Sequence, residues 1–302
     1  MTNRPVGEGE SAVPLDEAGP TARRRQLGYR LLALREASGL SAEAAGHLAG
    51  VSKATVSRYE RGKGNVRWNQ VDQLCRAYQA PDDEREALVT LARNSKPSDT
   101  WWVPYAGKLP DTMRLLLALE NEASQIRHHS VGVIPALLQT LPYAQAIKPT
   151  PGFELPVADV DDYLALRMKR QEILDRPSPP SYQVVLDEAV IRRAVGGPEV
   201  MATQLDHLLR RSQQPHISVQ ILPFSAGAYS AALSSFILYG SPDPALDVVF
   251  IESQVGSLFM EEPRAREEYA SAIDFLRREA LDPDASAGLI VEASKRHLTQ
   301  HN

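Results

Sequence analysis

Basic and hydroxyl side chains are closely spaced in the segment KATVSR, residues 53–58. If this segment is a helix, its apolar side carries Val56 and Tyr59 and is suited to burial. The other side presents small or polar side chains to solvent: Lys53, Ala54, Ser57 and Arg58. Hydrogen-bond donors on one helix face could contact the base edges and phosphates of a DNA duplex. The alternative interpretation is an ordinary solvated face that carries charged residues.

Each of these side chains suits a different part of a duplex. Lys53 and Arg58 can donate hydrogen bonds to O6 and N7 of guanine, whereas Ala54 can only contact a thymine methyl group. The hydroxyl groups of Thr55 and Ser57 are better suited to phosphate oxygens. Base contacts set sequence preference and phosphate contacts set register, so this short segment has groups for both tasks.

Two short helices joined by a tight turn are predicted over residues 41–62, SAEAAGHLAGVSKATVSRYERG. Ser41 and Ser52 are good N-caps for the two helices. Gly50 lies where the turn favours positive φ, and Gly62 can end the second helix in a left-handed conformation. These signals, in this order, predict a helix-turn-helix unit, which places its second helix in a DNA major groove.

Residues 23–93 resemble the phage-repressor-like (Xre/Cro) helix-turn-helix family through five helix-like segments without gaps. The resemblance implies that Lys53, Ala54 and Arg58 occupy base-reading positions. It also implies that the residues after the recognition helix contact the DNA backbone. The candidate DNA-binding residues are therefore Ser52, Lys53, Ala54, Thr55, Ser57, Arg58, Lys63, Asn65 and Arg67.

The same resemblance implies a structural role for Arg35 and Glu60. In the family, an arginine late in the first helix pairs with a glutamate late in the recognition helix. We expect this pair to brace the domain without touching DNA. Breaking it would be costly, because the remaining partner would keep a partly buried charge.

Charge is unevenly distributed along the chain. Residues 21–81 contain 11 Lys and Arg and 4 Asp and Glu, which gives a net charge of +7. The whole chain of 302 residues has a net charge of −5, so the remaining residues carry −12. A basic N-terminal domain followed by an acidic remainder is expected of a DNA-binding protein with a separate second domain. The overall acidity argues against non-specific coating of nucleic acid.

Composition and turn residues divide the chain into four parts. We predict a disordered tail at 1–20, a helix-turn-helix domain at 21–94, a linker at 95–100 and an α+β regulatory or interaction domain at 101–302. Further helices of the first domain are expected at about 21–38, at about 68–78, and from the cap at 81–83 to Arg93.

The larger domain is predicted to be helical over 101–176 and mixed α and β over 181–302. Its apolar periodicity favours a helix from Asp111 to about His128 and another over 159–174. Enrichment in β-branched and aromatic residues predicts strands at 182–186, 217–222, 236–240, 247–252 and 256–261. Helices are expected at 187–195, 198–212, 264–279 and 284–298. The predicted fold class is mainly α with an α+β C-terminal part.

The larger domain also resembles a known family. The motifs are the Trp101–Trp102 opening, LExEAxxI at 119–126, PALLQTLPYAQA at 135–146, LDEAVIRRAVGGPEVM at 186–201 and ILPFSAGAY at 221–229. They resemble the C-terminal domain of unknown function attached to Xre-type regulators of Streptomyces and related actinomycetes, the WhiJ-like antitoxin-type regulators. The resemblance implies no established enzymatic reaction. It implies a regulator with a binding or sensing surface, and in some members a small companion protein.

Polar residues within the apolar motifs are the candidates for binding a ligand or partner there. They are Gln139, Thr140, Tyr143, Arg167 and Arg170. The apolar residues of the same motifs are expected in the core rather than at a ligand, namely Leu137, Leu138, Leu222 and Phe224.

Catalytic and metal-binding patterns are missing from the sequence. The seven histidines show no His-Glu-x-x-His arrangement, and the single cysteine excludes both a Cys-x-x-Cys site and an intrachain disulfide. No nucleophile elbow, P-loop or dinucleotide fingerprint is present. We therefore expect no enzyme activity, no metal and no cofactor. The chain has no signal-peptide pattern and no long apolar run, so we expect a cytoplasmic protein without a membrane partner, associated with the nucleoid when bound to DNA.

The leading hypothesis is a sequence-specific DNA-binding transcriptional regulator with its recognition helix at about 52–61. A homodimer would bind a near-palindromic operator in double-stranded DNA, with half-sites ~34–36 Å apart. The alternative is an antitoxin-like interaction module that binds a small companion protein and uses DNA binding for autoregulation. A third possibility is a sensor of an unknown small-molecule effector, which is compatible with the first hypothesis.

Overall fold

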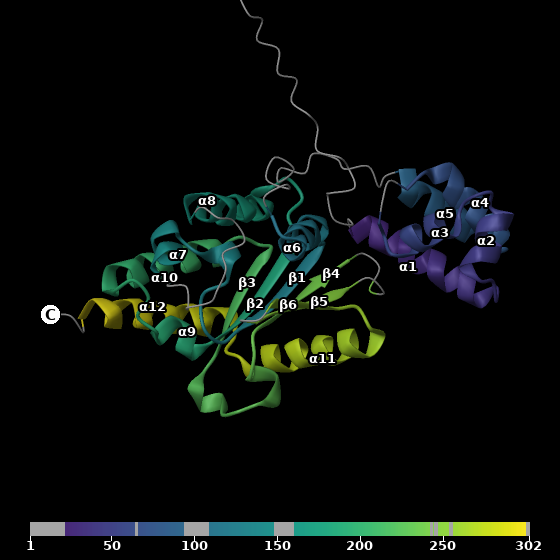
Figure 1. The fold of residues 1–302 in the computed structure, drawn as a ribbon. Coiled ribbons are helices and arrows are strands. Elements are labelled where there is room, and N and C mark those ends of the chain that lie inside the picture. The colour runs from purple at the N-terminus through teal and green to yellow at the C-terminus, as the bar shows by residue number, and fades with distance from the viewer. Residues whose placement is uncertain are drawn as a thin grey trace, which may run out of the picture. The chain divides into compact units, whose positions relative to one another are not determined.

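The computed structural model describes residues 22–63, 66–93, 109–147, 160–241, 244, 247–253 and 256–299. The chain divides into two units, residues 1–118 and 119–302 (Figure 1). The predicted tail at 1–20, the predicted linker at 95–100 and Asn65 lie outside the described residues. No helix in the described part of the chain is long and apolar enough to cross a membrane.

Residues 22–93 form the predicted five-helix domain. Its helices are α1 (Ala22–Ala37), α2 (Ala42–Leu48), α3 (Lys53–Glu60), α4 (Trp68–Ala77) and α5 (Asp82–Arg93). Their apolar faces meet in one core, in which Leu27, Val56 and Leu74 have no exposed surface. The helix bounds agree with the predicted ones to within about two residues, because caps and apolar periodicity both mark these ends.

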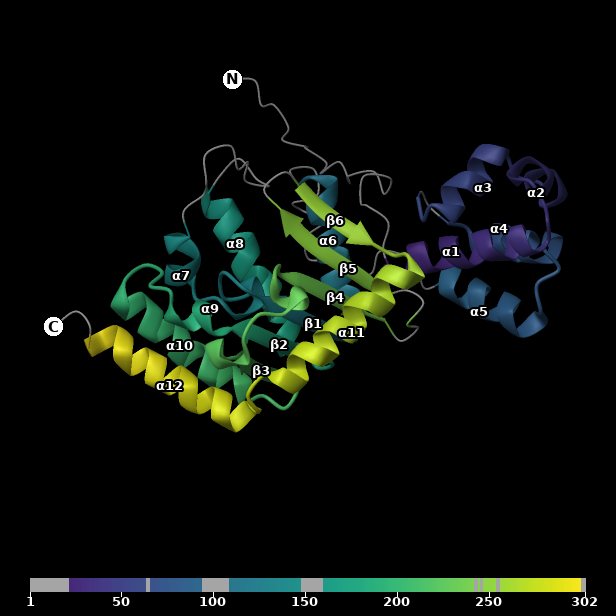
Figure 2. The same cartoon turned by 90° about the horizontal axis from the view of Figure 1, so that it is seen from below.

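A sheet of six strands, counted over the described residues, forms the centre of the C-terminal unit (Figure 2). Its order is β3–β2–β1–β4–β5–β6, and β1 pairs in parallel with β2 and antiparallel with β4. The strands are β1 (Gln125–Ser130), β2 (Ser181–Asp187), β3 (Ile217–Leu222), β4 (Phe236–Gly240), β5 (Val248–Ser253) and β6 (Gly256–Met260). β1 therefore joins the parallel half of the sheet to the antiparallel half.

Strand β1 corrects the predicted helix from Asp111 to His128 and the predicted all-helical segment 101–176. Helix α6 (Asp111–Glu122) ends before Ala123, and the chain continues as the strand that lies between β2 and β4. Ser124 donates its backbone N–H to the carbonyl of Gly240, and its own carbonyl accepts from Ser181. Pairing on both sides outweighs the weak local preference of QIRHHS, which contains a single β-branched residue. The predicted helix 159–174 also ends early, at Arg170, and continues as a 3₁₀ turn over Gln171–Asp175.

Helices lie on both sides of the sheet (Figures 1 and 2). α11 (Pro263–Glu279) crosses one face, where Ile273 and Leu276 pack with Val185 and Phe236. On the other face, Arg170 of α8 (Val160–Arg170) pairs with Glu120, which accepts a hydrogen bond from Tyr239 of β4. α10 (Pro198–Ser212) and α12 (Pro283–Thr299) pack against each other beside β3. Two short helices complete this part of the fold, α7 (Leu141–Ala146) and α9 (Glu188–Arg192).

The adjacent histidines of β1 point to opposite faces of the sheet, as consecutive strand residues do. Nδ1 of His128 lies 3.1 Å from the hydroxyl of Tyr182, on the face that carries the ion pair of Glu120. Nδ1 of His129 lies 3.1 Å from the carbonyl of Val185, on the α11 side. Burial lowers the pKa of both imidazoles, that of His128 to about 3, so both side chains are neutral at neutral pH.

Candidate nucleic-acid interface

Two serine caps and two glycine turns build the α2–turn–α3 unit. Oγ of Ser41 accepts from the N–H of Ala44, and Oγ of Ser52 accepts from the N–H of Thr55, each at 3.1 Å. Gly50 has φ +65° and Gly62 has φ +67°, so both adopt the left-handed conformation predicted for them. The predicted caps are thus confirmed.

Paired backbone hydrogen bonds close the C-terminus of each helix. After α2, the N–H of Val51 donates to the carbonyl of Gly46 at 2.9 Å. After α3, Lys63 donates to the carbonyl of Arg58 at 2.8 Å, and Gly62 donates to that of Tyr59 at 2.9 Å. This is the Schellman arrangement, which a left-handed glycine makes possible. It fixes where the recognition helix ends and where the following loop starts.

The exposed side of α3 carries the predicted base-reading residues. Lys53, Ala54 and Arg58 are exposed, whereas Val56 and Tyr59 are buried in the domain core. The structure thus brings the predicted donors together on one accessible helix face.

The two hydroxyl groups in the first turn of α3 are already engaged within the protein. Oγ of Ser52 lies 2.9 Å from Oγ1 of Thr55 and also accepts from the backbone of Thr55. Ser52 is therefore the N-cap of α3, and the side chain of Thr55 is half-buried. Ser57 is half-buried as well, and its carbonyl accepts from Nε of Arg61 at 2.9 Å.

A weak surface contact occupies Lys53. Its Nζ lies 3.9 Å from Oε2 of Glu43 on α2, and the two side chains are 67% and 80% exposed. Exposed pairs of this kind contribute little to stability, about 0–1 kcal/mol. Lys53 can therefore leave Glu43 for a base edge or phosphate at small cost.

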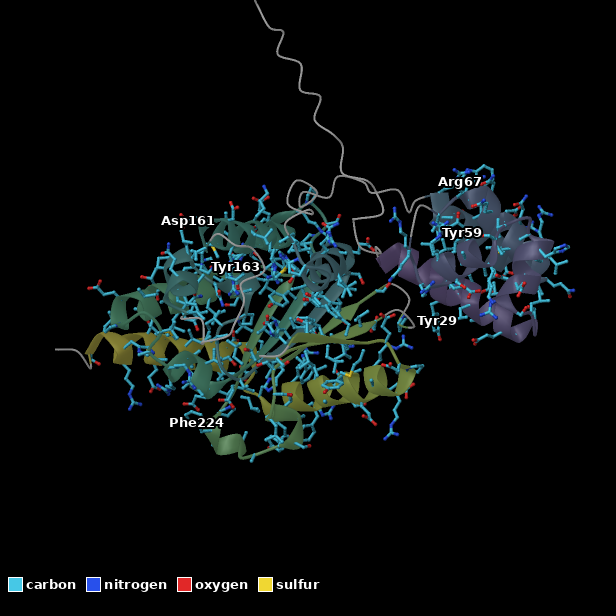
Figure 3. The ribbon with its side chains drawn as sticks, in the orientation of Figure 1. Tyr29, Tyr59, Arg67, Asp161, Tyr163 and Phe224 are labelled. Atoms are coloured by element: carbon cyan, nitrogen blue, oxygen red, sulfur yellow. The ribbon has the colours of Figure 1, made fainter. Side chains whose placement is uncertain are left out.

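Tyr59 positions the loop after the recognition helix. Its hydroxyl accepts from the backbone N–H of Arg67 at 3.2 Å and also bonds to the side chain of Gln70. Tyr59 and Arg67 lie near each other in Figure 3. Lys63 and Arg67 are both exposed, beside α3 in the chain. Exposed basic side chains at these positions are suited to phosphate contacts.

Arg35 and Glu60 form a two-point ion pair between α1 and α3. Nε of Arg35 lies 2.6 Å from Oε1 of Glu60, and Nη2 lies 3.2 Å from Oε2. Nη1 donates to the carbonyl of Leu40 at 2.8 Å. The side chains are only 15% and 8% exposed, so the pair is largely withdrawn from water. The hydrogen bond that Arg35 donates to Glu60 raises the pKa of Arg35, which remains charged.

Gly28 is a positioning residue that sequence reasoning missed. A Cβ atom at this position would lie 2.5 Å from the carbonyl oxygen of Tyr59 and 2.6 Å from that of Glu60. The end of α3 therefore packs directly against the backbone of α1. A glycine within a predicted helix was the available signal, because helix interiors disfavour glycine unless another backbone approaches closely.

Two further arginines of the helical domain, Arg61 and Arg93, are exposed and were not among the predicted contacts. Arg61 is exposed at the end of α3. The guanidinium of Arg93 lies 4.4 Å from the ring centroid of Trp68, which is 47% exposed at the start of α4. A cation held over an aromatic ring can still donate to a phosphate. Sequence spacing alone could not bring Arg93 and Trp68 together.

The five candidate residues of the C-terminal unit form hydrogen bonds with other residues of the protein. Gln139 donates to the carbonyl of Ile134 at 2.6 Å and accepts from Arg167 at 2.7 Å. Thr140 caps α7, and the hydroxyl of the fully buried Tyr143 accepts from the N–H of Ile134.

Arg170 has the most buried charge of these five residues. Its guanidinium binds both carboxylate oxygens of Glu120, at 2.9 and 2.5 Å. Burial alone would lower the pKa of Arg170, but the charge and hydrogen bonds of Glu120 outweigh it and raise that pKa. All five side chains therefore have partners within the protein, while Nε of Arg167 is buried without a hydrogen-bond partner among the described residues. The predicted recognition role of the five residues remains a prediction.

Comparison with protein families gives two matches. A model described as a helix-turn-helix domain matches residues 26–88. A model described as a domain of unknown function, DUF5753, matches residues 113–292. Searches of curated proteins and of solved structures returned no match. The first match covers the α2–turn–α3 unit and supports DNA as a partner, and the second covers more than half of the chain. The chain therefore belongs to the DUF5753 family and carries a helix-turn-helix domain in front of the family's domain.

Proposed function

We propose that the chain is a sequence-specific transcriptional regulator that inserts α3 into the major groove of an operator. The observation that carries this proposal is the exposed row of Lys53, Ala54 and Arg58 on a helix fixed at both ends and braced by Arg35. Because caps and the ion pair already hold the helix backbone in place, that backbone need not be ordered on binding, which favours affinity.

Under this proposal two chains bind as a homodimer to a near-palindromic site. Half-sites would lie about one helical turn apart, ~34–36 Å. The DUF5753 domain would bind a small molecule or a partner protein. Binding would change the spacing of the two helix-turn-helix domains or their availability for DNA. The protein would act by binding rather than by catalysis, in the cytoplasm and on the nucleoid. The actinomycete antitoxin-type regulators that the sequence resembles would be its functional relatives.

The test is a selection of bound duplexes from a random pool by the full-length protein at physiological salt. We expect one symmetric motif. Arg58→Ala should lose about 1–3 kcal/mol of affinity for that motif and relax the preference at one base pair, because a bidentate guanine contact disappears.

The matched control is Arg76→Ala, which removes an exposed arginine of α4 that pairs with Asp72 within its own helix. This variant should bind the motif like the unmodified protein. Equal loss in both variants, or none in Arg58→Ala, would refute base reading by Arg58. A small protein that co-purifies in stoichiometric amount, with no enriched motif, would instead favour the companion-protein role.

A further inference from the structure

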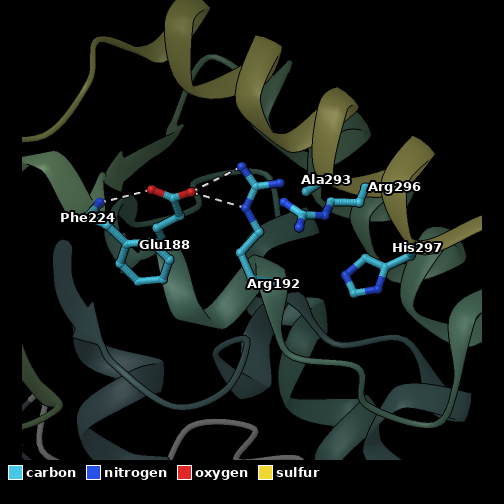
Figure 4. A pocket seen from close by; sticks show the side chains of 6 residues that line it. All are labelled: Glu188, Arg192, Phe224, Ala293, Arg296 and His297. Carbon is cyan, nitrogen blue, oxygen red and sulfur yellow. Dashed lines mark hydrogen bonds and ion pairs between the residues drawn. The ribbon is translucent and has the colours of Figure 1, made fainter. Parts of the chain in front are cut away.

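A pocket of about 310 Å³ lies between α9, α12 and the turn after β3 (Figure 4). It is lined by Glu188, Arg192, Phe224, Ala293, Arg296 and His297. None of the five candidate residues in the C-terminal unit lines it. Its volume falls at the lower end of the range of small-molecule sites, roughly 300–1,000 Å³.

The pocket contains one carboxylate, and both of its oxygens are already used. Oε1 of Glu188 accepts from Nε of Arg192 at 3.0 Å, and Oε2 accepts from the backbone N–H of Phe224 at 2.9 Å. The charge of Glu188 is thus matched by Arg192. Glu292 also lies 3.6 Å from Nη2 of Arg192, but its side chain is 65% exposed and is not part of the lining.

Two guanidinium groups retain unused donors. Nη1 of Arg192 is buried and has no hydrogen-bond partner in the part of the chain that the structure describes. The Arg296 side chain forms neither a hydrogen bond nor an ion pair with any described residue. Buried donors normally have partners, because an unpaired donor has lost its hydrogen bonds to water without replacing them. Glu188 is paired with Arg192, so no carboxylate of the lining matches the charge of Arg296.

An apolar wall stands beside these donors. The sequence predicts Phe224 in the core, but this residue is 60% exposed and lines the pocket. Its backbone N–H donates to Glu188. Ala293 adds a buried methyl group. Nε2 of His297 bonds to the carbonyl of Ile191 at 2.9 Å, which holds the imidazole against α9. An exposed aromatic ring beside two arginines with unused donors is a combination that a ligand with a flat apolar part and an anionic end would complete.

We propose that this pocket binds a small planar carboxylic acid in its ionised form. The carboxylate would accept from Arg296 and from Nη1 of Arg192, and the planar body would lie against Phe224. Inorganic phosphate would satisfy the arginines but leave the ring uncovered. The inference rests on the effector role proposed for the DUF5753 domain and gives that effector a chemical class.

The test uses 4-fluorobenzoate as the probe and follows its ¹⁹F resonance during titration with the full-length protein. We expect saturable binding with a Kd of about 1 mM or below. The neutral analogue 4-fluorobenzyl alcohol should bind at least about tenfold more weakly, because it cannot form the charge-assisted hydrogen bonds. Inorganic phosphate should compete only weakly, since it lacks a planar body.

Arg296→Gln provides the decisive variant, because Arg296 is exposed and its side chain forms no hydrogen bond or ion pair with a described residue. It should weaken binding of 4-fluorobenzoate about tenfold. Lys295→Gln removes the same charge from the neighbouring exposed position of α12, outside the pocket lining, and should leave the Kd unchanged. Phe224→Ala should also weaken binding of 4-fluorobenzoate.

Three results would overturn the proposal: no saturable binding of 4-fluorobenzoate, equal binding of the alcohol, or equal loss in the Arg296 and Lys295 variants. Tighter binding of phosphate than of 4-fluorobenzoate would also overturn it in favour of a phosphate site. The titration contains no DNA, so its failure is separate from that of the operator selection. A protein that selects an operator motif but binds no carboxylate would refute this inference alone.

Discussion

At the scale of single residues, the ion pair of Arg35 and Glu60 has the largest structural consequence. Glu60→Leu would leave the guanidinium of Arg35 in a site where it is 15% exposed. We expect a loss of about 3 kcal/mol in the stability of the helical domain, because an unpaired charge would remain withdrawn from water. The double variant Arg35→Met/Glu60→Leu should lose less than Glu60→Leu alone, since it contains no stranded charge.

Amide hydrogen exchange in α1 and α3 of the full-length protein measures this loss locally. At a temperature where the double variant is folded, its affinity for the selected operator should stay within about threefold of the unmodified protein. A greater loss of affinity in the folded double variant would show that the pair contributes directly to DNA binding. Equal destabilisation by the single and double changes would show that charge burial is not the cause.

The exposed face of α3 could be predicted from the sequence because helix geometry decides which side chains share a face. Lys53, Ala54 and Arg58 are exposed on α3, as their spacing predicts. The contacts of Ser52 with Thr55 could be predicted only in part. The helix cap follows from the sequence, but the hydrogen bond between the two hydroxyl groups does not. The pairing of Arg93 with Trp68 depends on how α4 and α5 pack, and no local pattern encodes it.

At the scale of elements, Gly28 and Gly288 allow the same substitution to be compared in two helices. An added Cβ at Gly28 meets two backbone carbonyls of α3 at 2.5 and 2.6 Å, whereas at Gly288 of α12 it meets nothing within 4 Å. Alanine stabilises a helix interior by about 0.5–1 kcal/mol over glycine when space permits. Gly28→Ala should instead lower the stability of the helical domain by about 1–3 kcal/mol, because the backbones of α1 and α3 must move apart.

Thermal unfolding of the two variants measures whether their stabilities change in opposite directions. Gly28→Ala should also weaken operator binding, since it shifts the recognition helix against α1, and Gly288→Ala should not. A stabilised Gly28→Ala protein with unchanged operator affinity would contradict the close helix contact described here.

Most elements of the C-terminal unit could be predicted from their own residues, but β1 could not. Strands such as ISVQIL and FILYG are rich in β-branched and aromatic residues, and both coincide with the predicted bounds. QIRHHS has neither property and continues an apolar helical pattern from α6. Its structure is set by β2 and β4, which lie more than 50 residues away in sequence. Central strands draw their stability from such distant partners, so local propensity is a poor guide to them.

At the scale of the whole molecule, the positive charge of residues 21–81 and the negative charge of the remainder predict how DNA binding depends on salt concentration. Five exposed basic residues lie on or just after α3, namely Lys53, Arg58, Arg61, Lys63 and Arg67. If all five contact the duplex, the logarithm of affinity should fall against the logarithm of salt with a slope of about −4 to −5 per head. Arg67→Ala should reduce the magnitude of that slope by about one and weaken all sequences alike.

Arg264→Ala makes the same change of charge on α11 of the other unit, where the side chain is 89% exposed. Its slope should match that of the unmodified protein, because counterions are released only where basic groups meet phosphates. If both variants lowered the slope equally, the net charge of the chain rather than the α3 surface would govern association. If Arg67→Ala altered the selected motif as Arg58→Ala is expected to, then Arg67 would read bases. The two measurements together separate the part of the affinity that any duplex provides from the part that only the operator provides.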